Sequence, residues 1–497
     1  MDLSVAADRR ERGLAKIDAK RSVWRRREDY YRGRQDLPYA PPGVSAEYLQ
    51  LREMAGANWL ALAMDTPTQR LRADGFRTGR DEAADATTWN EVWQPNNLDS
   101  RQRIVYSQMF VHGRGLMSVW PNPSDRKSPV IRPESSERVH VQMDPEDPFT
   151  AAWAVKSFTV EDRPVGSNLI VPGSVASPRE RQVAVVYDRD SWVRFERGGS
   201  SYSGEWTVAA NGSHPLGAVP FVTFDHRQDA DGQPWSAIEP LMQQQDALNT
   251  IRFQTLLAMQ FAAYRQRAIV GYDPVIRDQQ GQPLFELDGD GKPVLDAQGR
   301  PKPLLQSMGR AGVDRILAFP GADTKVFDMP ESNLANYITV LGEFLSDLFA
   351  LGQVPPQYLL NRMSNLSGDA LAGAESTLQS LVADLQRTVG ESLEEVMRLA
   401  NRARGEDEPD LASEVVWADA EARSFAQTVD GITKLVTVGL PRQAAFEMVP
   451  GATPVKVRRW MELSAEERRA AAVDDPIARA AEALRVLPPA PEVEPVA

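Results

Sequence analysis

The residues best suited to chemistry lie close together between positions 225 and 231. Asp225, His226, Asp229 and Asp231 supply three carboxylates and one imidazole. Carboxylates can hold a divalent metal ion and a histidine can transfer protons, so this composition suits a metal-dependent nuclease. The same residues directly follow a predicted strand and run into the turn sequence Gly232-Gln233-Pro234. The sequence therefore favours a solvated loop here over a nuclease site.

Other catalytic and metal-binding patterns are missing or incomplete in the sequence. No P-loop pattern occurs, and the four histidines do not pair at metal-ligand spacing. Asp288-Gly289-Asp290-Gly291 suggests a calcium loop, but Lys292 stands where an EF-hand needs a ligand, and the later glutamate is missing. We therefore expect no cofactor, no bound metal and no enzymatic activity.

The composition narrows the class of protein. The chain has 497 residues, 56 basic and 69 acidic side chains, a net charge of −13 and no cysteine. A protein that grips nucleic acid is usually basic, whereas an acidic one can guide DNA without holding it tightly. The lack of cysteine fits assembly in a reducing cytoplasm. Residues 1–27 contain no apolar stretch typical of a signal peptide.

Two long segments, 235–267 and 332–351, repeat apolar residues every three or four positions, which predicts helices with one buried face. The apolar positions are Ile238, Leu241, Met242, Leu248, Ile251, Leu256, Met259 and Phe261 in the first segment, and Leu334, Tyr337, Ile338, Leu341, Phe344, Leu345 and Leu348 in the second. The charges and glutamines of the first segment make a membrane span unfavourable. On periodicity alone, a helical hairpin inside a globular core is the simpler interpretation.

The region before these helices has a mixed α+β pattern. A basic helix, interleaved with acidic residues, is expected to end at Tyr30-Tyr31-Arg32-Gly33, where the glycine can serve as a C-cap. A solvated helix with internal ion pairs is the favoured interpretation, and a nucleic-acid-binding arm is the alternative. Residues 47–120 are mostly helical in pattern, and short apolar runs separated by turns then predict antiparallel strands up to about residue 224.

The segment between the two long helices carries Gly281-Gln282-Pro283, Gly291-Lys292-Pro293 and Gly299-Arg300-Pro301, which predict successive hairpins in a small β-rich module. A third long helix is expected from Ser367 as N-cap. Two short helices follow, and Ser464-Ala465-Glu466-Glu467 predicts a capping box that opens a further helix. The proline-rich end of the chain is expected to be disordered.

The order of these elements resembles the portal proteins of tailed bacteriophages, especially those of long-tailed siphophages. The resemblance extends over roughly residues 25 to 400. It rests on Tyr30-Tyr31-Arg32-Gly33, Trp93-Gln94-Pro95-Asn96-Asn97-Leu98-Asp99, His112-Gly113-Arg114-Gly115, Val219-Pro220-Phe221-Val222, Gln245-Asp246-Ala247-Leu248-Asn249, Pro355-Pro356-Gln357-Tyr358-Leu359 and Ser367-Gly368-Asp369-Ala370-Leu371.

The resemblance implies a multi-domain α+β portal fold, with an α/β wing, a long helical stem, a small β-rich clip and an α-helical crown. The implied domains are the wing with its N-terminal helix (1–234), first stem helix (235–268), clip (269–330), second stem helix (331–351), tunnel loop (352–366), long wing and tunnel helix (367–404), and crown with disordered tail (405–497).

Functional residues follow from the resemblance by position. A channel loop should carry small polar groups and little fixed charge, so that DNA can slide. The expected tunnel-loop residues are Gln353, Gln357, Asn361, Arg362, Ser364 and Asn365. The expected inter-subunit residues of the stem are Leu241, Phe253, Phe261, Tyr337, Phe344 and Leu345. The expected docking residues of the clip are Arg277, Lys292, Arg300 and Lys302.

The function implied by the resemblance is a ring, typically of twelve subunits, at one capsid vertex. It would act in genome packaging, head-tail connection and DNA ejection after assembly in the host cytoplasm. The implied partners are double-stranded DNA, the terminase large subunit, major capsid and scaffolding proteins, and a head-completion or adaptor protein, with no membrane. The alternatives are another virion scaffold protein without a DNA channel, and a metal-dependent nuclease.

Overall fold

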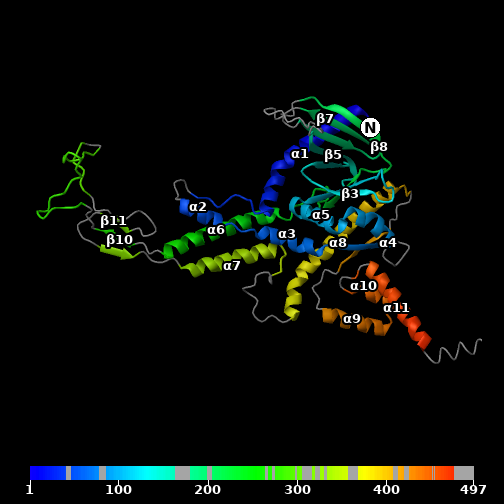
Figure 1. The fold of residues 1–497 in the computed structure, drawn as a ribbon. Coiled ribbons are helices and arrows are strands. Elements are labelled where there is room, and N and C mark those ends of the chain that lie inside the picture. The colour runs from blue at the N-terminus through cyan, green and yellow to red at the C-terminus, as the bar shows by residue number, and fades with distance from the viewer. Residues whose placement is uncertain are drawn as a thin grey trace, which may run out of the picture. The chain divides into compact units, whose positions relative to one another are not determined.

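The computed structural model describes residues 1–40, 46–77, 85–162, 179–198, 204–263, 267–270, 275–296, 299–304, 316–319, 325–328, 333–355, 368–406, 412–418, 425–449, 452 and 454–474. The chain forms two compact units (Figure 1). The first unit comprises Met1–Gln35, Asn58–Met242 and Phe349–Ala497, and the second comprises Asp36–Ala57 and Gln243–Leu348.

The fold is mixed α+β, as predicted, and its sheets are largely antiparallel. The α-helices are α1 (Leu3–Tyr31), α2 (Ala46–Met54), α3 (Trp59–Arg70), α4 (Ala86–Thr88), α5 (Leu98–His112), α6 (Glu239–Ala263), α7 (Leu334–Leu351), α8 (Gly368–Arg404), α9 (Phe425–Val438), α10 (Arg442–Glu447) and α11 (Pro454–Asp474). The strands are β1 (Ala73–Arg77), β2 (Arg114–Trp120), β3 (Val130–Glu134), β4 (Val139–Met143), β5 (Ala151–Asp162), β6 (Arg179–Tyr187), β7 (Ser191–Gly198), β8 (Thr207–Ser213), β9 (Phe221–Asp225), β10 (Arg267–Val270), β11 (Ile316–Phe319), β12 (Lys325–Asp328) and β13 (Glu414–Trp417).

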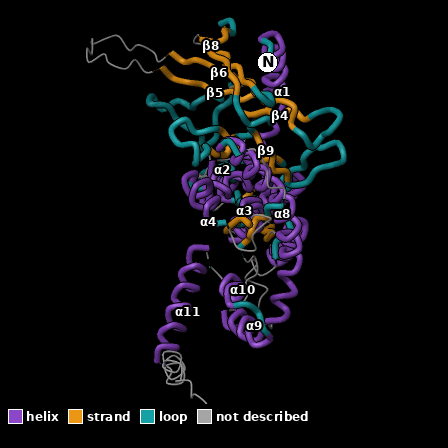
Figure 2. The backbone as a smooth tube through the Cα atoms, turned by 90° about the vertical axis from the view of Figure 1, so that its right-hand side faces the viewer, coloured by secondary structure: helices purple, strands orange, loops and turns teal. Residues whose placement is uncertain are grey.

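Helix α1 lies along a five-stranded antiparallel sheet of order β4-β5-β6-β7-β8 (Figure 2). Gly13 permits this close approach, because a Cβ there would come within 2.6 Å of the Val155 side chain. The guanidinium of Arg10 lies over the rings of Phe195 and Trp206, at 4.6 and 5.1 Å from their centroids. Apolar packing and cation–π contacts therefore hold the basic helix on the sheet.

A three-stranded sheet, β3-β2-β9, forms the second layer of the first unit, and α5 packs against it. Leu116 of β2 and Phe221 of β9 pack against Val141 and Ala154 of the five-stranded sheet in one apolar cluster. A Cβ on Gly115 would lie 2.4 Å from the carbonyl oxygen of Val105, so the glycine is required where β2 passes beneath α5. The β3-β2-β9 sheet therefore packs on the five-stranded sheet with one face and on α5 with the other.

The motif Trp93 to Asp99 is a structural junction. A π-helical turn, Trp89–Trp93, and a 3-10 turn, Gln94–Asn96, lead into α5 through Asn97, whose φ of 53° is left-handed. The Trp93 indole N–H donates to Asp99 Oδ1 at 2.8 Å. The buried Asn96 amide donates to the carbonyls of Val92 and Pro129, and its oxygen accepts from the Ile131 N–H. These contacts fasten the start of α5 to strand β3.

The motif Gln245 to Asn249 forms hydrogen bonds within the second unit. Gln245 and Asn249 stand four residues apart on α6, and Gln245 Nε2 donates to both Asn249 Oδ1 and the Ala57 carbonyl, each at 2.9 Å. The Ala57 N–H donates to Asn249 Oδ1 at 3.1 Å, and Arg252 Nε donates to the Ala55 carbonyl at 2.9 Å. Polar side chains of α6 thereby form hydrogen bonds with the backbone N–H and carbonyl groups that follow α2.

The predicted hairpins occur in the second unit, and they share the pattern Asp-x-x-Gly-x-Pro at 278–283, 288–293 and 296–301. In each turn the aspartate Oδ1 accepts the N–H of the residue four positions on, at 2.8 to 2.9 Å. The turn glycines have φ between +75° and +82°. The aspartates of the suspected calcium loop therefore build turns.

Two rings of three backbone hydrogen bonds join these hairpins into a branched module, drawn in green in Figure 1. In the first, the N–H groups of Ile276, Leu304 and Leu284 donate to the carbonyls of Leu304, Leu284 and Ile276. In the second, the N–H groups of Glu286, Lys302 and Val294 donate to the carbonyls of Lys302, Val294 and Glu286. The prediction of hairpins is confirmed, and their closed three-way joining was not predicted.

Several boundaries differ from the sequence predictions. Strands β1 and β3 were not predicted, and β1 pairs with the distant β13. Helix α6 begins at Glu239 and not at residue 235, because residues 235–238 make hydrogen bonds elsewhere. Helix α11 begins at Pro454, so Ser464 lies inside a helix and does not open one. Proline suits a first helical position, since its missing N–H needs no partner there. The expected N-cap Ser367 and the proline-rich tail lie outside the described residues.

Replacing Gly115 with alanine tests the packing of α5 on β2. The new methyl group would meet backbone and not a flexible side chain, so Gly115→Ala should lower the free energy of unfolding by about 1–3 kcal/mol. Gly198→Ala is the matched control, because a Cβ at Gly198 would meet nothing within 4 Å. Urea denaturation of both variants measures the difference. Equal unfolding midpoints would contradict the packing described.

Candidate assembly and channel site

The final carbonyls of α5 receive their hydrogen bonds from α1 and from the segment that precedes α6. The last carbonyls of any helix lack partners inside the helix and must find them elsewhere. The bonds are Ala237 N–H to Phe110 O at 2.9 Å, Ser236 Oγ to Val111 O at 2.7 Å, Arg27 Nη1 to His112 O at 2.9 Å, and His226 N–H to Gly113 O at 3.0 Å. Segment 226–238 is thereby fixed to the end of α5.

Gly113 makes this arrangement possible. Its φ is +88°, and a Cβ there would lie 2.9 Å from the backbone of Trp235. Arg27 of α1 adds a second link, because it also pairs with Glu239 at the first turn of α6, at 2.5 Å. The motif His112 to Gly115 therefore helps to connect the β3-β2-β9 sheet to α6.

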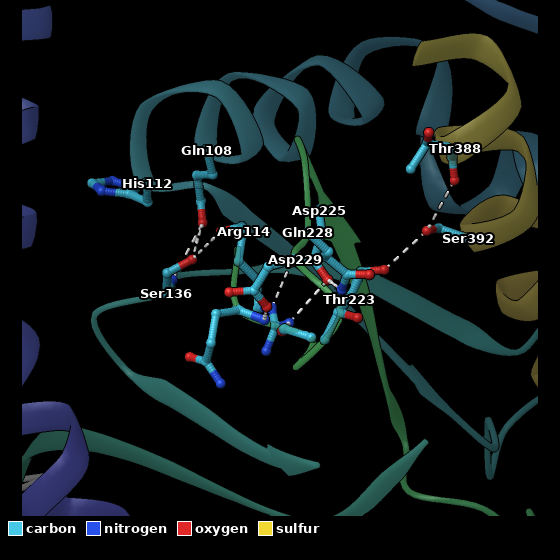
Figure 3. Close-up of polar contacts among 12 residues, drawn as sticks. Gln108, His112, Arg114, Ser136, Thr223, Asp225, Gln228, Asp229, Thr388 and Ser392 are labelled. Atoms are coloured by element: carbon cyan, nitrogen blue, oxygen red, sulfur yellow. Dashed lines mark hydrogen bonds and ion pairs between the residues drawn. The ribbon is translucent and has the colours of Figure 1, made fainter. Parts of the chain in front are cut away.

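An ion pair with a buried carboxylate lies next to segment 226–238 (Figure 3). Arg114 on β2 binds Asp225 on β9 through two hydrogen bonds, Nε to Oδ1 at 2.6 Å and Nη2 to Oδ2 at 3.0 Å. The Asp225 side chain is 5% exposed, and Arg114 also donates to the Gly232 carbonyl at 3.3 Å. Gln228 donates to Asp225 Oδ2. Asp225 is thus a structural residue, and the prediction of a solvated position for it is wrong.

The remaining residues of the suspected nuclease cluster also have structural roles. Asp229 Oδ1 accepts the N–H groups of Asp231 and Gln233, at 3.0 and 2.8 Å, and so shapes an exposed turn. The His226 ring packs against Phe110 with centroids 4.9 Å apart. Among the described residues no group of three or more metal-binding side chains converges. Asp225, His226 and Asp229 each serve the fold in this region.

A cleft of about 740 Å³ opens in the first unit where α7 ends. Its lining includes Arg27, Phe110, Trp235, Leu351 and Gln353. Gln353 has a left-handed φ of 53°, and its N–H donates to the Ala350 carbonyl at 3.2 Å. The chain therefore turns sharply at Gln353. The other expected tunnel-loop residues, Gln357, Asn361, Arg362, Ser364 and Asn365, lie outside the described residues.

Helix α7 exposes apolar side chains. Within the described part of the chain it is the one helix long and apolar enough to cross a membrane, and 11% of that stretch is buried. Ile338, Val340 and Leu351 are 65%, 44% and 61% exposed. One such helix is weak grounds for a membrane span, and the exposed apolar residues lie on more than one side of α7, since Ile338 and Val340 are about 200° apart around its axis. Sequence reasoning had placed Ile338 in the apolar pattern without selecting it as a contact residue.

The expected contact residues of the stem differ in exposure. Leu241 and Phe253 are 1% and 6% exposed, so they are buried within the subunit and have little surface for a neighbour. Tyr337, Phe344 and Leu345 are half-buried, and the side chain of Phe261 lies outside the described part of the chain. Inter-subunit packing of these six residues remains a prediction.

The expected docking residues of the clip lie on the hairpin module and are all exposed. Lys302 pairs with Glu286 at 2.6 Å, and Arg277 Nη1 donates to the Gly281 carbonyl at 3.1 Å. Lys292 and Arg300 stand in the turns, where their backbone N–H groups bind Asp288 and Asp296. The four cations are distributed over three hairpins.

Removing the Asp225 carboxylate tests whether the ion pair holds segment 226–238. Asp225→Ala leaves the largely buried Arg114 without its partner, which should reduce the free energy of unfolding by about 3 kcal/mol. Asp229→Ala removes a carboxylate only four residues away that serves one exposed turn, and its cost should be below about 1 kcal/mol. Similar midpoints for the two variants in chemical denaturation would refute the assigned role.

The buried histidine of the same region should make stability depend on pH. Burial, and then the charge of Arg227, lower the pKa of His226 to about 4. Because the unfolded chain binds a proton near pH 6.5, stability is complete above that pH and falls as the pH drops toward 4. His226→Asn should remove part of this slope, at most about 3 kcal/mol. Denaturant titrations at pH 7, 5.5 and 4.5 measure the slope, and an unchanged slope in the variant would exclude His226 as its source.

Comparisons with known proteins identify the family. Residues 14–473 match the family model described as phage portal protein, SPP1 Gp6-like. The chain is 29% identical over 440 residues to the portal protein of Mycobacterium phage D29, covering 84% of this chain and 81% of that protein. It is 28% identical over 421 residues to the portal protein of Mycobacterium phage L5, covering 81% and 77%.

A chain from the neck of an empty GTA particle, computed with C6 symmetry, aligns over 81% of this chain and 92% of its own length. Its identity is 12% and its TM-score 0.38, a likeness too loose to support an inference. The family match extends over most of the chain and agrees with both curated relatives. The chain belongs to the SPP1 Gp6-like family of phage portal proteins, structural components of the virion that form an oligomeric DNA channel at a capsid vertex and are not enzymes.

Proposed function

We propose that α7 supplies an inter-subunit surface of the portal ring. In this assignment α6 and α7 are the stem helices, residues up to 234 form the wing, and residues 269–330 form the clip. The tunnel loop occupies 352–366, the long helix 367–404, and the crown begins at 405. The observation that supports it is the exposure of apolar side chains on α7, among them Ile338 at 65%. Repeated contacts of this kind are heterologous and must close into a ring, for which we propose twelve subunits.

The hairpin module suits the role of clip. Its described part, 275–296 and 299–304, carries the exposed cations Arg277, Lys292, Arg300 and Lys302 beside exposed leucines such as Leu287, at 63%. Cations near exposed apolar groups are common in protein interfaces. We assign these residues to docking of the terminase large subunit during packaging, and of a head-completion or adaptor protein afterwards. Capsid and scaffolding proteins are the proposed partners of the remaining surface.

The tunnel loop is proposed to line the path of double-stranded DNA during packaging and ejection. The sharp turn at Gln353 gives the loop a fixed starting point, and Gln357, Asn361, Ser364 and Asn365 add amide and hydroxyl groups without charge. Arg362 is the one strong phosphate ligand among the six. Weak contacts of this type let the duplex move.

A charge placed on the exposed face of α7 tests the ring interface. Ile338→Asp should reduce the fraction of subunits in rings at least about tenfold, because a carboxylate would be buried against a neighbour. Asn336→Asp adds the same charge at an exposed polar position of the same helix and should leave assembly intact. Native mass spectrometry and negative-stain microscopy count the rings. Full assembly of Ile338→Asp would exclude α7 as an inter-subunit surface.

A further inference from the structure

Helix α1 gathers cations on one side. At about 100° per residue, positions 9, 12, 16, 20 and 27 fall within an arc of about 80°. These residues, the α1 stripe, are Arg9, Arg12, Lys16, Lys20 and Arg27. The acidic residues Asp8, Glu11 and Asp18 fall outside that arc. Residues 1–34 hold eleven basic and six acidic side chains, although the whole chain has a net charge of −13.

The outer members of the stripe form ion pairs with acidic residues of the same chain, whereas the two central lysines do not. Arg9 lies 3.5 Å from Asp188, Arg12 pairs with Asp8, and Arg27 pairs with Glu239. Lys16 and Lys20 are exposed and form no ion pair with any of the residues that the structure describes. The centre of the stripe therefore offers two free ammonium groups, about 6 Å apart along the helix.

The surroundings of Lys20 increase the positive potential. Partial desolvation, and then the charges of Arg114, Lys16 and Arg27, lower the pKa of Lys20. His140, on the edge strand β4, has a buried Nε2 without a hydrogen-bond partner, and the charges of Lys20 and Lys16 help burial to lower its pKa to about 4. Cations crowded in this way are stabilised by a bound anion.

We propose that the α1 stripe binds the phosphate backbone of double-stranded DNA outside the channel. Two unpaired lysines, flanked on the same side of a 29-residue helix by ion-paired arginines, fit a linear polyanion better than a single carboxylate. Lysines recognise phosphate without regard to base sequence, as a surface that meets any part of a genome requires. Repetition around a ring would multiply weak single contacts into useful affinity. The inference does not depend on which residues line the channel.

Closed circular DNA distinguishes binding at the α1 stripe from binding in the channel, because a covalently closed duplex cannot be threaded through a ring. Assembled wild-type protein, checked by native mass, is titrated with relaxed closed circular DNA at several salt concentrations. The test variant is Lys16→Glu with Lys20→Glu. The control is Arg21→Glu with Arg25→Glu, which makes the same charge change on the opposite side of α1.

The test variant should lose at least about tenfold in affinity at low salt and show a shallower salt dependence, whereas the control should stay within about twofold of wild type. Equal losses of DNA affinity in both variants would mean that binding depends only on net charge. Unchanged affinity in the test variant would mean that the stripe is a solvated helix face that does not bind DNA. Rings that fall apart in the test variant alone would assign the stripe to a second copy of the chain. Each of these three results would overturn the proposal.

Discussion

The end of α5 is the constraint on which the first unit depends. Four carbonyls at a helix terminus have to be satisfied, and here the donors come from α1 and from the segment that leads into α6. The Arg114–Asp225 pair holds the start of that segment by joining β2 to β9. A helix end, two strands and the first turn of a long helix are thereby connected by a few hydrogen bonds.

This construction explains why short polar motifs recur in the chain without forming a reaction centre. Asn96 and Asp99 join α5 to its neighbours, Gln245 and Asn249 hold the backbone after α2, and the turn aspartates shape the hairpins. Asp99 accepts the indole N–H of Trp93, and the other groups bind backbone that would otherwise remain unsatisfied. Such groups suit a structural component of the virion, whose task is to keep its shape while DNA passes.

Sequence reasoning predicted the elements whose pattern is local. The period of the apolar residues predicted α6, α7 and α8, and the Gly-x-Pro turns predicted the hairpins. It missed β1, since that strand is defined by pairing with β13 some 340 residues further along the chain, as Phe76 with Val415. The Arg114–Asp225 pair was missed for the same reason, because no spacing in the sequence signals that β2 and the distant β9 are neighbours in the sheet. For Leu241 and Phe253, periodicity identified an apolar helix face. It did not show whether the same subunit or a neighbouring subunit covers that face.

Portal function requires that these subunits close around a hole. Negative-stain electron microscopy of the purified chain, together with its native mass, measures this directly. The account predicts rings with a central channel and a mass near twelve times 55.1 kDa. A compact oligomer of a few subunits without a central hole would contradict it.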